Sequence, residues 1–108
     1  MILYYKRDGT PYEEGEEQQF YKDFVNWDLR QVALDLIGNI RISTVWLGMD
    51  HGFLLEKPII FETMVFSHPK SGYGDWCERY CTEDEALAGH YKILQEILNE
   101  CSCKEFML

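Results

Sequence analysis

The chain has 108 residues, of which 46% are hydrophobic and 15% aromatic, so it has the length and core-forming side chains of a single domain, residues 1–108. Nineteen acidic against ten basic residues give a formal net charge of −9. This charge repels phosphate backbones, which argues against direct nucleic-acid binding, and it attracts basic partners, including nucleic-acid-binding proteins. No run approaches the roughly 20 apolar residues of a membrane span, and the N-terminus does not resemble a signal peptide. We therefore expect a cytoplasmic protein that does not bind membranes.

A short strand over 2–5 and an acidic helix over 13–28 are the first predicted elements. Apolar residues recur at helical steps of three and four in the second segment. The helix dipole favours the negative charge at its expected N-terminus. The glutamates there are Glu13, Glu14, Glu16 and Glu17.

Period-two patterns follow and predict antiparallel strands. The turn Gly38-Asn39 is typical of a two-residue β-hairpin. The strand over 59–66 is apolar on both faces, which predicts a central place in the sheet. The predicted strands cover 32–36, 40–47, 59–66 and 76–81.

The clearest local signal is a capping box, in which Thr82 starts a helix and Glu85 reaches back to the cap. Gly89 is unfavourable within a helix and predicts a close approach to a strand. The predicted apolar stripe comprises Leu87, His90, Leu94, Ile97, Leu98 and Cys101. Together the patterns predict an α+β fold: a mainly antiparallel sheet of four or five strands, a C-terminal helix packed on one face and a short acidic N-terminal helix.

The sequence has four cysteines, Cys77, Cys81, Cys101 and Cys103, which could form disulfides, bind zinc or remain free thiols. Four thiolates can bind zinc, although only the first pair has the usual spacing. The absence of an export signal favours reduced thiols instead. We expect free thiols and neither a bound metal nor a cofactor.

Three blocks of sequence resemble a group of small phage and prophage proteins of unassigned function. They are STVWLGMDH at 43–51, PIIFETMVF at 58–66, and ERYCT at 78–82 with EALAGH at 85–90. The blocks stand in the same order and at similar spacing in that group. The resemblance implies a phage setting and carries no known chemistry.

Candidate catalytic residues are Asp50, His51, Glu62 and His90. If Glu62 lies near Thr44 across a strand pair, a carboxylate and two imidazoles could converge, as in an acid–base or divalent-metal site. The alternative is structural. His90 and Glu62 then lie largely buried with partners inside the protein, and Asp50 accepts a hydrogen bond from an amide two residues on.

Two functions follow from these observations. The first is a phage-encoded interaction protein that inhibits a host anti-phage defence system, such as a CRISPR nuclease, by presenting an acidic surface to a basic or nucleic-acid-binding host protein. The second is a small metal-dependent or acid–base hydrolase that uses the four candidate catalytic residues. The candidate partner-binding residues are Glu13, Glu14, Glu16, Glu17, Glu83 and Asp84, with Glu85 beside them. Helix-dipole compensation explains the same clusters without a partner. The oligomeric state does not follow from the sequence.

Overall fold

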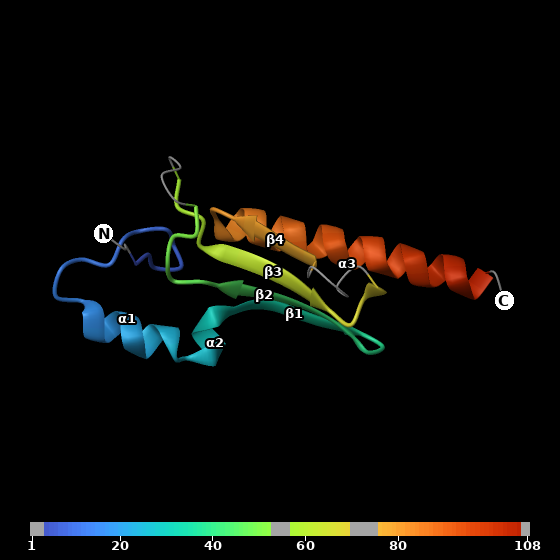
Figure 1. The fold of residues 1–108 in the computed structure, drawn as a ribbon, viewed down its shortest axis with the longest axis horizontal. Helices are drawn as coiled ribbons and strands as arrows, with labels where there is room; N and C mark the ends of the chain where they lie inside the picture. Colours follow the sequence, from blue (N-terminus) through green and yellow to red (C-terminus); the bar gives the residue numbers. More distant parts are fainter. Residues whose placement is uncertain (1–3, 53–56, 70–75, 107–108) are drawn as a thin grey trace.

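The computed structural model describes residues 4–52, 57–69 and 76–106, with side chains up to residue 100. These residues form a four-stranded antiparallel sheet with a long C-terminal helix against it and two short helices before it (Figure 1). The elements are α1 (Glu17–Phe24), α2 (Trp27–Arg30), β1 (Gln31–Ile37), β2 (Ile40–Trp46), β3 (Phe61–Phe66), β4 (Trp76–Tyr80) and α3 (Glu83–Phe106). The predicted α+β fold is confirmed.

The sheet is a meander in the order β1-β2-β3-β4. Gly38 adopts a φ of +60° in the predicted hairpin turn, and Ile37 pairs with Ile40 directly across it. β3 lies between two neighbours, as its apolar character predicts. The strand order therefore follows the order of the strands along the chain.

Pleating divides the side chains of these strands into two faces. The covered face, toward α3, includes Ala33, Asp35, Ile42, Thr44, Trp46, Phe61, Thr63, Val65, Trp76 and Tyr80. The open face, on the other side, includes Leu34, Leu36, Arg41, Ser43, Val45, Glu62, Met64, Phe66, Cys77 and Arg79. Helix α3 contacts all four strands, so a single helix covers this face of the sheet.

Helix α3 begins after the predicted cap residue Thr82, but the Glu85 carboxylate reaches the hydroxyl of Thr82 rather than its backbone amide. The Glu85 amide donates to Thr82 Oγ1 over 3.1 Å, and the Thr82 hydroxyl donates to the Glu85 carboxylate over 3.0 Å. A Cβ on Gly89 would lie 2.2–2.4 Å from the ring and hydroxyl of Tyr80, which confirms the predicted close approach. The glycine therefore lets α3 lie directly on β4.

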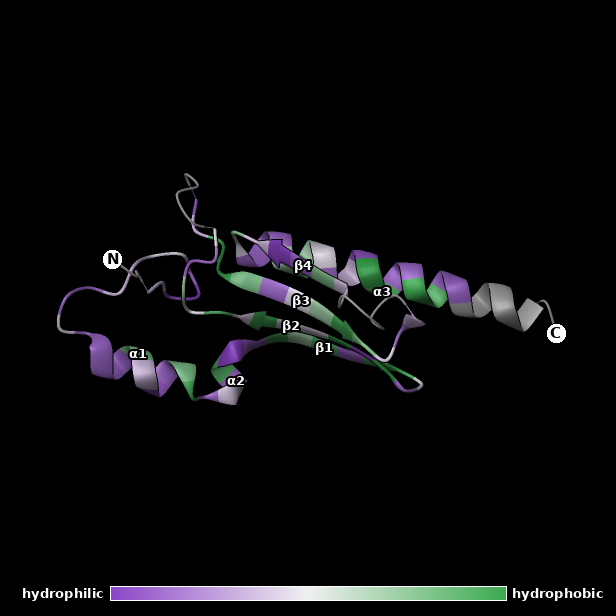
Figure 2. Cartoon of the chain, in the orientation of Figure 1, coloured by the Kyte–Doolittle hydropathy of each residue, from purple (hydrophilic) through white to green (hydrophobic). Residues whose placement is uncertain are grey.

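The buried side of α3 differs from the predicted stripe. The fully buried positions are Ala86, His90, Ile93 and Ile97, whereas Leu98 is exposed. Figure 2 shows how hydrophilic and hydrophobic residues alternate along this helix. His90 and Ile97 belong to the predicted set, so the stripe is rotated rather than lost; Cys101 lies among the residues whose side chains are not described.

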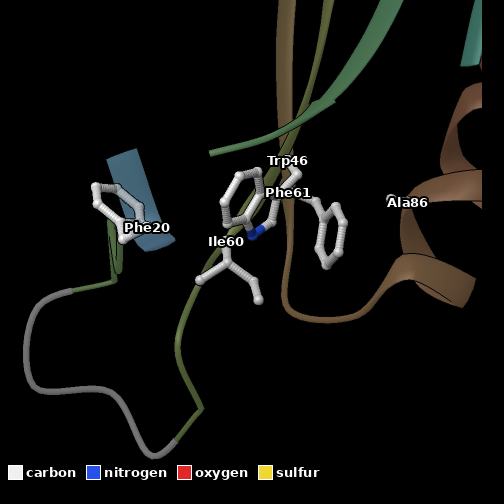
Figure 3. Close-up of a cluster of buried hydrophobic side chains, with 5 residues drawn as sticks. All are labelled: Phe20, Trp46, Ile60, Phe61 and Ala86. Atoms are coloured by element: carbon white, nitrogen blue, oxygen red, sulfur yellow. The ribbon is translucent and has the colours of Figure 1, made fainter. Parts of the chain in front are cut away.

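Two apolar clusters form the core of the covered face and of the adjoining end. The first joins Phe20 of α1 to Ala86 of α3 through Trp46, Ile60 and Phe61 (Figure 3). The second consists of Ile42, Val65, Ile93 and Ile97. The clusters pack α1, the sheet and α3 against one another.

The single helix predicted over 13–28 is wrong in its boundaries. Gly15 has a φ of +93°, and α1 starts two residues later, at Glu17. The Asn26 side chain accepts hydrogen bonds from the Asp28 and Leu29 amides and starts α2 from an extended backbone. A second N-cap thus breaks the expected helix.

Of the N-terminal strand predicted over 2–5, the described part consists of isolated bridges: Tyr4 pairs with Met49 and Tyr5 with Pro11. Residues 1–3 lie outside the described part of the chain. No helix in the described residues combines the length and the apolar character needed to cross a membrane.

Candidate functional site

The predicted convergence of Glu62 and His90 is wrong. Glu62 pairs with Val45 rather than Thr44, and its side chain lies on the open face. His90 reaches the covered face from α3 and bonds to Thr44 there. A one-residue difference in register changes the face of a side chain, and so the sheet separates the two groups.

Asp50 shapes the loop that follows β2. Its Oδ1 accepts the Gly52 amide over 2.7 Å and the Ile59 amide over 2.9 Å. The first bond is the one predicted by the structural alternative, from an amide two residues on. The His51 backbone amide also donates to the Ile59 carbonyl, over 2.9 Å. Both residues therefore close the loop against the start of the next strand.

A buried polar chain crosses the covered face from α3 to three strands. His90 Nε2 lies 2.7 Å from Asp35 Oδ2, and His90 Nδ1 lies 2.7 Å from Thr44 Oγ1. The hydroxyls of Thr44 and Thr63 are 2.5 Å apart. Because a carboxylate only accepts, Nε2 donates to Asp35; in the neutral ring Nδ1 then accepts from Thr44, which accepts in turn from Thr63. The burial of His90 and its internal partners are confirmed.

In this network of hydrogen bonds, a histidine links a threonine hydroxyl to an aspartate, which is the arrangement that activates a nucleophile. However, Thr44, Thr63 and His90 are all 0% exposed. No substrate atom can reach the Thr44 hydroxyl in this conformation, so the groups satisfy one another as a structural network. Sequence reasoning missed Asp35 and Thr63, since their convergence depends on the strand register and the rotation of α3.

Glu62 is held on the open face by two neighbours from β4. Its Oε2 accepts Arg79 Nε over 2.9 Å and the Cys77 thiol over 3.2 Å. The Glu62 side chain is 12% exposed, so its predicted burial with internal partners is confirmed. Burial and the adjacent Glu62 raise the pKa of the Cys77 thiol to about 11. The thiol is therefore protonated at neutral pH and is a poor nucleophile.

The predicted acidic clusters flank one turn near the N-terminus. Lys6 Nζ lies 3.7 Å from the Glu16 carboxylate, and the next residue, Arg7, pairs with Glu83 at the start of α3. Adjacent residues thus contact both clusters, which places them around one end of the molecule. The carboxylate-bearing residues that remain exposed there are Asp8, Glu13, Glu14, Glu17, Asp84 and Glu85.

A hollow of about 490 Å³ opens at this end, between the N-terminal turn and the start of α3. Asp8, Glu83 and Asp84 contribute carboxylates to its lining, and Arg7 contributes a cation that is paired with Glu83. The hollow therefore keeps a net negative lining that suits a positively charged side chain.

Cys77 and Cys81 are free thiols. The side chains of Cys101 and Cys103 lie outside the described residues. The structure therefore describes only two of the four cysteines that the zinc alternative requires. Within the described residues, no group of three or more histidine, cysteine or acidic side chains is arranged to hold a metal ion.

Comparisons with family models, with curated proteins and with solved structures found no significant match. The functional argument therefore depends on the residues and contacts of this chain.

Proposed function

We propose that this protein is a phage-encoded interaction protein that binds a basic host protein through the acidic surface around its N-terminal turn. A nucleic-acid-binding component of an anti-phage defence system, such as a CRISPR nuclease, is the proposed target. Its basic groove offers the charge that complements this surface. The resemblance to phage and prophage proteins supports the setting.

The observation that carries the proposal is the pairing of Lys6 with Glu16 and of Arg7 with Glu83. These pairs bring two clusters distant in sequence to the same end of the domain. Each pair engages one carboxylate of its cluster, and the other carboxylates remain exposed. The remaining carboxylates lie exposed around the N-terminal turn, and the hollow lined by Asp8 and Asp84 lies beside it.

Charge reversal tests the proposal. The double variant Glu14→Lys with Glu17→Lys changes two exposed acidic residues and leaves the pair with Lys6 intact. The matched control is Asp28→Lys with Glu78→Lys, which changes the net charge equally; Asp28 and Glu17 both lie in the first turn of a helix. Circular dichroism before the assay confirms that both variants are folded.

The assay measures how each variant inhibits, or binds to, a purified defence nuclease with a basic groove. We expect the first variant to lose at least tenfold in affinity, the control to lose much less, and the affinity of the natural chain to fall with added salt. Equal affinity for both variants, unchanged across a salt series, would contradict the acidic-surface mechanism.

A further inference from the structure

The open face of the sheet is a second surface, separate from the acidic end. It carries Leu34, which is 41% exposed, and Leu36, which is 68% exposed. Val45, Met64 and Phe66 continue the apolar surface onto the inner strands and are partly exposed. A hollow of about 400 Å³ lies over these strands, with Trp27 and Arg30 of α2 at its margin. The residues are contiguous and differ from the scattered surface leucines that most proteins show.

Charge distinguishes this face from the rest of the chain. Three arginines, Arg30, Arg41 and Arg79, stand on or beside it, in a protein whose net charge is −9. Arg79 and the acidic residue Glu62 are paired and neutralise each other, so Arg30 and Arg41 supply the net positive charge of the face. The open face is therefore an apolar surface with a positive rim, the reverse of the acidic end.

The covered face shows what fits a sheet of this shape. There one amphipathic helix, α3, contacts all four strands and completes the layer. Four strands about 4.8 Å apart and six residues long, at about 3.3 Å each, present roughly 400 Å². This flat area is small beside the roughly 800 Å² of accessible surface that each partner buries in a standard protein–protein interface. A single helix matches the open face better than a second folded copy does.

We infer that the open face binds an amphipathic helix of a partner protein whose polar positions are acidic. The apolar side of that helix would pack on Leu34, Leu36 and Val45, and its carboxylates would reach Arg41 and Arg30. The partner helix would then cover this face as α3 covers the other.

Single-stranded nucleic acid is a less suitable occupant. Sheets that bind it use uncovered aromatic rings on which bases stack. Here the Arg41 guanidinium lies 4.6 Å from the centre of the Phe66 ring and already covers it. The exposed residues on β1 are aliphatic, and the net charge of the protein opposes a phosphate backbone.

Two synthetic 18-residue helical peptides test the inference, both with leucine at positions i, i+3, i+4 and i+7. One carries glutamate and the other lysine at every polar position. Each peptide is titrated into the full chain, and binding is followed by methyl NMR. We expect the glutamate peptide to shift the methyl signals of Leu34, Val45 and Met64. We also expect it to bind at least tenfold more tightly than the lysine peptide.

Arg41→Glu provides the decisive variant, with Lys92→Glu on α3 as its control. We expect Arg41→Glu to weaken the glutamate peptide at least tenfold and to strengthen the lysine peptide, a gain that only a folded protein can show. Lys92→Glu should change neither affinity more than about twofold, as expected for a charge outside the contact. Equal binding of both peptides, or an unchanged peptide preference in Arg41→Glu, would overturn the inference. So would shifts of the same methyl groups that are larger with an oligothymidylate, or on dilution of the protein alone, than with the glutamate peptide.

Discussion

The two faces of the sheet are built from the same strands, yet they have different environments. Trp46 and Ile42 on the covered face are 0% exposed, whereas Leu36, on the neighbouring strand, remains largely in solvent. Both faces are rich in apolar residues. Burial therefore depends on what packs against a face, and an apolar face that the domain leaves open is a surface available to another molecule.

The largest contrast is expected between two tryptophans. Trp46→Ala removes a buried ring from the core and its hydrogen bond to the Tyr5 carbonyl, at a cost of about 3–5 kcal/mol in the free energy of unfolding. Trp27→Ala, at the margin of the open face, should cost less than about 1 kcal/mol, since that ring is 54% exposed. Urea denaturation measures both, and equal losses would remove the distinction between the faces.

The polar groups of the two faces should also differ. His90→Ala leaves Asp35 and Thr44 without their shared partner, and the loss of a buried partner costs about 1–3 kcal/mol. Glu62→Ala should lower stability less, because Arg79 is about half exposed and can bind water instead. Thermal melts at neutral pH would show the difference, and two variants that melt like the natural chain would contradict the assigned contacts.

Adjacent residues on β2 offer a finer comparison. Thr44→Val keeps the shape of the side chain but removes the hydroxyl between His90 and Thr63, and we expect a loss of about 1–2 kcal/mol. Ser43→Ala, one residue away on the open face, should change stability by less than about 0.5 kcal/mol. Chemical denaturation of the two variants in parallel would test the strand register directly, because a one-residue slip predicts the opposite order.

Much of this architecture can be predicted from the sequence, because the signals are local. The turn at Gly38-Asn39, the capping box at Thr82 and the close approach at Gly89 each depend on neighbouring residues or on one backbone preference. The break at Asn26 was missed, since apolar spacing alone does not reveal a second N-cap.

The sites depend on longer-range geometry. In β1 the period of two was predicted, yet the apolar phase containing Leu34 and Leu36 faces outward and Asp35 faces α3. The sequence cannot show this orientation, because it follows from the register with β2 and the position of His90 on α3. The same reason explains why Glu62 and His90, each on an apolar stripe, lie on opposite faces.

A smaller effect is expected at Cys77, whose thiol lies beside Glu62 on the open face. Its pKa is raised in the folded state, so the protonated thiol favours folding; this contribution is fully present below about pH 9 and is lost as the pH rises from 9 to about 11. Alkylation of Cys77 at pH 8 should therefore be slow. Glu62→Gln removes a negative neighbour, lowers the pKa of Cys77 and should speed alkylation several-fold.

Peptide mass spectrometry of alkylated protein resolves this rate for each cysteine separately. The rate at Cys81 in the same samples controls for general unfolding. A rate at Cys77 that is already fast at pH 8, or that does not respond to Glu62→Gln, would contradict the described contact.

The most direct test of the difference between the faces is the stability of Leu34→Ser combined with Leu36→Ser, measured at two protein concentrations. If the open face is a surface for a partner and contributes little to the fold, the double variant should unfold within about 1 kcal/mol of the natural chain, with no dependence on concentration. A loss of several kcal/mol, or a loss that grows with protein concentration, would show that these leucines are already buried by the domain or by a second copy, and would contradict the account.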